Sequence, residues 1–150
     1  MAKRERANAS ENISISKKRF ELYKRAIQQF NQALEAGFFL EAITICESLI
    51  TDRLESRCEE LGKSMSFQTL GNLIKKLKQI EIDLEVRNLV TNELDDWRKN
   101  RNTALHEIVK FEKGESPEWK NRVEASGDYA VEGMAIFRKI DGRVTKLRKG

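Results

Sequence analysis

The fold of this chain is decided by residues 38–62, which read FFLEAITICESLITDRLESRCEELG. Apolar side chains recur there at alternating steps of three and four residues, which places them along one face of an α-helix. They are Phe39, Ile43, Cys46, Leu49, Ile50, Leu54, Cys58 and Leu61. Gly62 follows the last of them, and glycine is the residue at which many helices end. The stretch therefore predicts one long amphipathic helix.

The same spacing occurs upstream, between Phe20 and Leu34, and stops at Gly37. This pattern predicts another amphipathic helix with a glycine at its C-terminal end. Almost no loop separates it from residues 38–62. Such a short connection predicts that the two helices form an antiparallel hairpin.

Three further helices are predicted downstream, and no segment competes with them as a strand. The first is short, is capped by Ser66 and has an apolar face from Phe67 to Ile80. The second is longer, is capped by Asp83 and has an apolar face from Val86 to Val109. The last begins at Ser116 and Pro117, has a buried face from Trp119 to Ile140 and ends at Gly142. The expected fold class is all-α, an antiparallel up-and-down helical bundle of four long helices plus one short helix. It spans residues 17–142, between a polar basic leader at 1–16 and a basic tail at 143–150.

Length and composition agree with one globular domain. The chain has 150 residues, of which 39% are hydrophobic and 35% charged, too many apolar residues for a disordered protein. No run approaches the roughly twenty apolar residues that a membrane span needs. The charged N-terminus has no apolar core of the kind found in signal peptides. These observations predict a cytoplasmic protein that does not interact with membranes.

Cysteine and histidine are too few for most metal sites. Cys46 and Cys58 are expected on one helix, about 18 Å apart at 1.5 Å per residue, which excludes a disulfide between them. With a single His in the chain, no zinc-ligand cluster can be assembled, and a metal site would have to consist of carboxylates. We therefore expect neither a metal nor a cofactor.

Positive charge is concentrated at both ends of the chain. Residues 1–25 carry eight Lys or Arg against three Glu, and residues 134–150 carry six against Asp141 alone, so that each end has a net charge of +5. Because the whole chain has a net charge of +4, the residues between carry −6. Two interpretations stay open: solvated termini, or a basic rim that attracts a polyanion such as a nucleic acid.

Residues 97–107, which read WRKNRNTALHE, contain the groups best suited to chemistry. Arg101 stands where the helical stripe requires an apolar side chain, so its burial needs a partner or a cleft. Asn100, Asn102 and Thr103 are weak helix formers that favour caps and kinks, and a bend is expected here. On a straight helix, Arg101 and His106 would diverge by about 140°.

The motif Arg101-Asn102-x-x-x-His106 resembles the Arg-polar-x-His signature of the HEPN superfamily. These are small all-helical proteins found in toxin-antitoxin, abortive-infection and CRISPR-associated systems. The resemblance extends over residues 17–142, because the predicted helices follow in the order that the family uses, with the motif late in the fourth.

The resemblance implies a metal-independent endoribonuclease whose site is composed across a homodimer, with RNA as substrate and an antitoxin or other defence-system protein as a further partner. His106 would transfer protons, Arg101 would stabilise charge on the phosphate, and Asn102 would orient the phosphate or the imidazole. Since each chain has one His, a dimer would supply both acid and base. Ile108 stands where toxins paired with nucleotidyltransferase antitoxins often have Tyr, so control through that Tyr is not expected.

Two supporting residues each have two interpretations. Glu47 either points toward the cleft or is a solvated helical neighbour, and Trp97 either stacks on a base or belongs to the core or a dimer interface. Arg101 and His106 themselves have a structural alternative, in which Arg101 pairs with Glu47. The corresponding alternative function is a non-catalytic HEPN-like helical module that binds a protein partner or a nucleotide. Burial of Arg101, Asn102 and His106 within one protomer would favour it.

Overall fold

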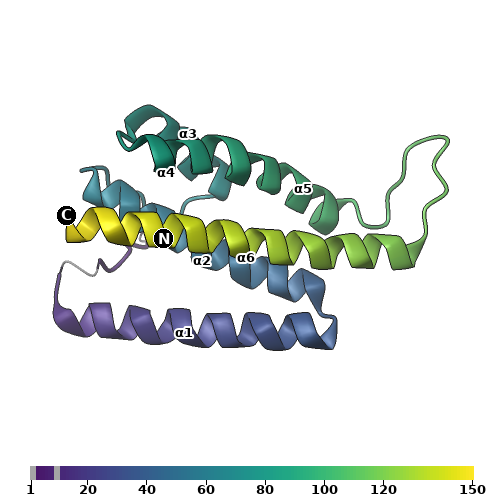
Figure 1. Cartoon of the computed structure of the whole chain (residues 1–150), viewed down its shortest axis with the longest axis horizontal. Coiled ribbons are helices and arrows are strands. Elements are labelled where there is room, and N and C mark those ends of the chain that lie inside the picture. The colour runs from purple at the N-terminus through teal and green to yellow at the C-terminus, as the bar shows by residue number, and fades with distance from the viewer. Residues whose placement is uncertain (1–2, 9–10) are drawn as a thin grey trace.

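The computed structural model describes residues 3–8 and 11–150, and these residues form helices and no strand (Figure 1). The all-α class is therefore confirmed. In chain order the elements are α1 (Ile13–Ala36), α2 (Phe39–Glu60), α3 (Leu70–Ile80), α4 (Leu84–Asn88), the π-helical segment η1 (Leu89–Leu94), α5 (Asp95–His106) and α6 (Trp119–Lys149).

Helix α2 is the centre of the arrangement, because it packs against α1, α3, α5 and α6. Figure 1 shows α1 on one side of α2 and α6, and the run from α3 to α5 on the other. Only Gly37 and Phe38 separate α1 from α2, so the chain reverses there and the two helices lie side by side, as predicted. The Arg101-Asn102-x-x-x-His106 motif is carried by α5, at the end of the molecule near this turn.

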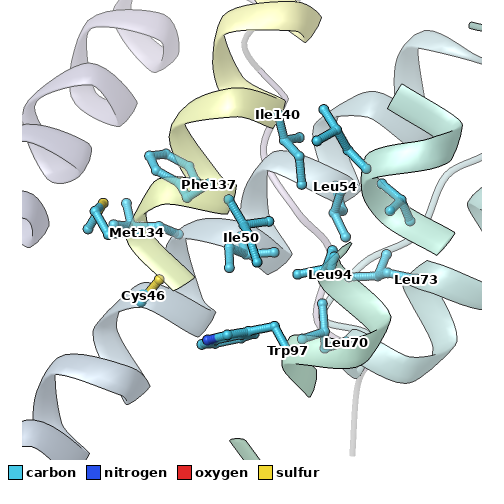
Figure 2. Close-up of a cluster of buried hydrophobic side chains, with 14 of the residues drawn as sticks. Cys46, Ile50, Leu54, Leu70, Leu73, Leu94, Trp97, Met134, Phe137 and Ile140 are labelled. Carbon is cyan, nitrogen blue, oxygen red and sulfur yellow. The ribbon is translucent and has the colours of Figure 1, made fainter. Parts of the chain in front are cut away.

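The core consists of the predicted apolar stripes. Figure 2 shows side chains from α2, α3, η1, α5 and α6 meeting in one cluster, among them Cys46, Ile50, Leu54, Leu73, Trp97 and Ile140. All six are almost inaccessible to solvent. Cys46 and Cys58 are both free thiols, which confirms that no disulfide joins them.

Two predicted helix ends are confirmed. Gly37 ends α1 in the left-handed conformation, with φ of +82°, which glycine adopts without steric cost. Asp83 caps α4, since its carboxylate accepts a hydrogen bond from the Val86 amide at 3.0 Å. Both ends depend on local chemistry, and local chemistry is visible in a sequence.

The predicted start of the third helix is wrong. Helix α3 begins at Leu70 and is capped by Thr69, whose hydroxyl accepts from the Asn72 amide at 3.2 Å. Phe67, expected on the buried face, has φ of +52° and is exposed. The guanidinium of Arg4 lies 4.3 Å from the centre of its ring, so Phe67 makes a cation–π contact with the N-terminal segment and does not join the buried face.

The fourth predicted helix is one continuous run of α4, η1 and α5 that ends at His106, three residues before the expected Val109. Val86, Val90 and Leu94 are all buried, although steps of four drift by about 40° on a regular α-helix. The π-helical turns of η1 take up this drift. The irregular segment therefore precedes the motif, and residues 95–106 are α-helical throughout, without the break expected at Asn100 to Thr103.

The last helix was misplaced at both ends. It begins at Trp119, beyond Ser116 and Pro117, and Trp119 is exposed although it was expected to be buried. It continues through Gly142 to Lys149, so residues 143–149 are helix and not a tail. Ile140 and Val144 are buried on either side of Gly142, and their packing outweighs the weak helix propensity of one glycine.

The basic ends of the chain are tied to acidic residues of the helices. Helix α1 begins inside the expected leader, at Ile13. Residues 1–2 and 9–10 of that leader lie outside the described residues. Arg6, also in the leader, pairs with Asp52 of α2 at 3.0 Å. At the other end, Arg143 binds Asp83 and Arg148 binds Glu60. These cations are thus neither fully solvated nor free to form a rim, because they neutralise carboxylates of the same chain.

No helix among residues 3–8 and 11–150 has the length and apolar character that a membrane crossing requires. The same residues contain no group of three or more His, Cys, Asp or Glu placed to hold a metal ion.

Candidate functional site

Arg101 is held by an ion pair with Glu47. Its Nη2 lies 2.9 Å from Oε1 of Glu47 on α2, and the two side chains are 12% and 25% exposed. The carboxylate repays the cost of placing a guanidinium on the apolar stripe of α5. Glu47 therefore points toward the motif and is not a solvated neighbour. This pair is the contact expected under the structural alternative.

The Arg101 guanidinium is not fully satisfied by this contact. Its Nε is buried and has no hydrogen-bond partner within residues 3–8 and 11–150, although a guanidinium presents five N–H donors. The Glu47 pair is the one ion pair that it makes in this part of the chain. The side chain thus has a buried donor that Glu47 does not satisfy.

His106 is the last residue of α5, and its side chain is exposed. Asn102, one turn earlier, is half-buried and makes no side-chain hydrogen bond within the described residues. Because α5 is regular between Arg101 and His106, the two side chains leave the helix in directions about 140° apart. Arg101 turns inward to Glu47, whereas His106 faces solvent. One protomer therefore does not bring Arg101 and His106 to a common point.

Trp97 belongs to the core and is fully buried. Its Nε1 donates a hydrogen bond to the carbonyl oxygen of Tyr129 on α6 at 2.7 Å. Gly133 leaves the space for its ring, because a Cβ there would lie 2.5 Å from the indole. The interpretation of Trp97 as a base-stacking residue is wrong, and that of a core residue is confirmed (Figure 2).

Arg122 is a residue of this region that the sequence did not identify. From α6, its Nη1 donates to the carbonyl oxygens of Glu107 and Ile108, at 2.8 and 3.2 Å. Both carbonyls belong to residues that follow the last helical residue of α5, so the contact joins α6 to the segment that leaves the helix. Arg122 thus fixes the chain where it leaves α5, directly after His106. No sequence signal distinguishes it from the other arginines of the chain.

An apolar cavity opens beside the C-terminal end of α5. It has a volume of about 360 Å³ and is lined by Phe38, Leu40, Ile108, Trp119 and Val123, with other residues of the α1–α2 turn and the start of α6. Phe38 and Trp119 are both more than half exposed. Large apolar side chains gathered on a surface mark an interaction site. One sequence signal for this surface exists: Phe38 is a large apolar residue in a predicted turn, where side chains are commonly exposed.

Neither thiol of the chain is a nucleophile at neutral pH. Burial, and then the charge of the neighbouring Glu47, raise the pKa of Cys46 to about 12. Burial likewise raises the pKa of Cys58 to about 11, with Glu55 and Glu81 adding to the shift. Since the thiolate is the reactive form, His106, Arg101 and their neighbours are the remaining candidates for chemistry in this region.

Comparison of this chain with protein-family models, with curated proteins and with solved structures finds no match. The assignment of a function therefore depends on the residues described above.

Proposed function

We propose that this chain is a HEPN-like protein, an antiparallel bundle of four long helices and one short one, that cleaves RNA without a metal at a site composed across a homodimer. The observation that carries the proposal is the position of His106. The only histidine of the chain is exposed at the end of the helix that holds Arg101, beside an exposed apolar surface. Such a histidine is accessible both to a substrate and to a second copy of the chain.

The reaction requires two proton transfers, and one chain has a single imidazole. His106 would accept the proton of the 2′-hydroxyl, and the 2′-oxygen would form a bond to phosphorus. The bond from phosphorus to the 5′-oxygen of the next nucleotide would break, with a proton supplied by His106 of the partner subunit. The products are a 2′,3′-cyclic phosphate and a 5′-hydroxyl. Arg101 would stabilise the charge on the phosphoryl oxygens, with Asn102 orienting the phosphate.

The apolar surface around Phe38 and Trp119 suits the dimer contact. It borders the end of α5, so a partner bound there would bring its own α5 end near His106. Exposed aromatic side chains at the centre of an interface commonly supply most of its binding energy. In a cell, we place the protein in the cytoplasm, as an RNA-cleaving toxin or defence nuclease with an antitoxin or other defence protein as partner.

Cleavage of RNA in EDTA tests the chemistry. The protein should cut single-stranded RNA, leave 2′,3′-cyclic phosphate ends and spare DNA, which lacks the internal nucleophile. His106→Ala should slow cleavage by about 10² to 10⁴-fold, whereas the neighbouring exposed Glu107→Ala should cut at the normal rate. Circular dichroism should show both variants folded. A folded His106→Ala protein with unchanged cleavage would end the catalytic assignment.

Arg101→Ala separates catalysis from the structural alternative. If the protein folds and loses cleavage, by an amount on the order of 3 kcal/mol of transition-state stabilisation, Arg101 acts on the substrate. If Arg101→Ala unfolds the protein, its pair with Glu47 is a structural one. The non-catalytic module that binds a partner would then be the better account. The half-buried position of Arg101 beside Glu47 is compatible with such a structural role.

Light scattering tests the composite site. The protein should have twice its monomer mass of 17.4 kDa at micromolar concentration. Trp119→Asp should give the monomer and abolish cleavage together, because it places a charge in the apolar contact. Ile82→Asp, a matched change at an exposed apolar residue between α3 and α4, should leave both unchanged. A monomer that cleaves RNA would contradict the composite site.

A further inference from the structure

A second cavity lies along α1, away from the motif. Helix α1 packs mainly on α2 (Figure 1), which leaves a groove between α1 and the C-terminal half of α6 with part of α2 as its floor. We call it the α1–α6 groove. Its volume is about 690 Å³, within the roughly 300 to 1,000 Å³ of ligand pockets. It extends along α1 from Ser16 to Gln28, about 18 Å at 1.5 Å per residue.

One part of the groove is an apolar strip. Phe20, Tyr23 and Ile27 recur at steps of three and four on α1, and Phe137 faces them from α6. The rings of Tyr23 and Phe137 lie 6.1 Å apart, centre to centre, so they form the apolar wall where α1 approaches α6. Phe20 is 68% exposed although it lies in the groove. Covering this strip with an apolar ligand would remove it from water, which is favourable.

The other part of the groove is cationic. Arg19 of α1, Arg53 of α2 and Arg148 of α6 line the end where α1 begins and α6 finishes. Lys24 lies on the rim and forms no ion pair within residues 3–8 and 11–150. The facing carboxylates are Asp52, Asp141 and Glu60, which pair with Arg19, Arg53 and Arg148 in turn. Four cations against three carboxylates leave an excess of positive charge.

Two guanidinium groups at this end have unused donors. Nη1 of Arg19 and Nε of Arg53 are buried without an acceptor in the part of the chain that the structure describes, and Oδ1 of Asp141, which lies 2.8 Å from Nη2 of Arg53, is likewise buried without a hydrogen bond. Buried donors are almost always paired, and an unpaired one is costly. The arginines are therefore held in place by their carboxylates but are not satisfied by them. A small shift of either side chain toward a bound anion would supply the missing acceptor.

We propose that the α1–α6 groove binds a single-chain amphiphile with an anionic head, either a carboxylate or a phosphate monoester. The chain would lie along Phe20, Tyr23 and Ile27, and the head would meet Arg19, Arg53 and Arg148. The separation of the groove into an apolar strip and a cationic end favours this class over two others. A neutral lipid has no anionic group to pair with the arginines, and inorganic phosphate has no apolar chain to cover the strip. The site is independent of the proposed cleavage of RNA.

Calorimetric titration tests the proposal with four probes: decanoate, decyl phosphate, 1-decanol and inorganic phosphate, each below the concentration at which it self-associates. At least one of the two anionic amphiphiles should bind saturably at one site per chain, and the comparison between them identifies the head. 1-Decanol should bind about tenfold more weakly, since it lacks the charge-assisted hydrogen bonds. Equal binding of decanol and the anions, or saturation by phosphate alone, would overturn the proposal.

A double variant locates the site. Phe20→Ser with Lys24→Glu changes two exposed residues of the groove, so the fold should survive, and affinity should fall at least tenfold. The matched control is Leu22→Ser with Lys18→Glu, two exposed residues of α1 that do not line the groove, and it should bind normally. Unchanged affinity in the first variant would overturn the assignment. So would the absence of binding together with a change in oligomeric mass, because a second copy would then be the occupant.

Discussion

The two ends of α5 differ, although they belong to one regular helix. At its start, Trp97 is fully buried, bonded to the Tyr129 carbonyl and fitted against Gly133. At its end, His106 is exposed beside an apolar cavity, with Arg101 between them in a half-buried ion pair. The apolar stripe is thus interrupted at Arg101, resumes at Ala104 and Leu105, and gives way to an exposed side chain only at His106. The first end supplies stability, and the second end is available for function.

Trp97→Ala should have the largest effect on stability. Removing a buried indole leaves a cavity and an unpaired Tyr129 carbonyl, and should lower the free energy of unfolding by about 3–5 kcal/mol. Urea denaturation followed by circular dichroism measures it. The control is Phe111→Ala, which truncates an exposed aromatic residue that follows the other end of α5 and lines neither cavity, and it should stay within about 0.5 kcal/mol. Equal losses in the two variants would remove the contrast between the ends.

Gly133→Ala should destabilise by about 1–3 kcal/mol through overpacking. The added methyl group would lie 2.5 Å from the Trp97 ring, so one of the two helices has to shift. Trp97→Phe should relieve part of this loss when the two changes are combined, because the smaller ring leaves room. Gly142→Ala, on the same helix with nothing within 4 Å of the new methyl group, should instead stabilise by about 0.5–1 kcal/mol. Strictly additive losses at Gly133 and Trp97 would contradict a direct contact.

Glu47→Ala should cost about 1–2 kcal/mol in the free energy of unfolding, because Arg101 would be left half-buried without its carboxylate. Glu47→Ala with Arg101→Leu should recover most of that loss, since an apolar residue then occupies the apolar stripe. Chemical denaturation of the two single variants and the double variant gives the coupling energy directly. A coupling near zero would show that the pair is no more than an exposed one.

Asp83→Asn should have the smallest effect, and one that depends on pH. The hydrogen bonds of Arg143 lower the pKa of Asp83 to about 2, below the value of about 3.9 of an unfolded Asp. A lowered pKa in the folded state contributes stability above the unfolded value, and this contribution is lost as pH falls through about 2. Asn keeps the helix cap and removes the charge. The difference in urea midpoint should therefore be present at pH 7 and vanish near pH 2; a constant difference would assign it to the cap.

Local chemistry explains what the sequence could predict of the fold. The stripes of α1 and α2, the glycine after α1 and the cap at Asp83 all depend on neighbours a few residues away, and they are present. The predictions for Phe67 and Gly142 are wrong because packing between separate elements, which a local pattern does not show, bears on both residues. Arg4 lies over the Phe67 ring, and the buried Ile140 and Val144 carry α6 through Gly142.

The candidate site was predictable to a similar degree. The misfit of Arg101 on an apolar stripe indicated a buried partner, and Glu47 was named as one interpretation, which the ion pair confirms. Arg122 and the Tyr129 carbonyl were not predictable, because their roles arise only when α6 lies against α5. The divergence of Arg101 and His106 followed from helix geometry alone. The catalytic roles of both remain predictions.

The pairing of the basic ends with the body has a practical consequence for the boundaries of the domain. A fragment trimmed to residues 17–142 would lose Arg6, Arg143 and Arg148, which leaves Asp83 without its ion-pair partner and Asp52 and Glu60 with one partner each, Arg19 and Arg57. The carboxylates left behind would repel one another more strongly at low ionic strength than at high. Such a fragment should be rescued by salt, whereas the full chain carries its counterions within its own sequence.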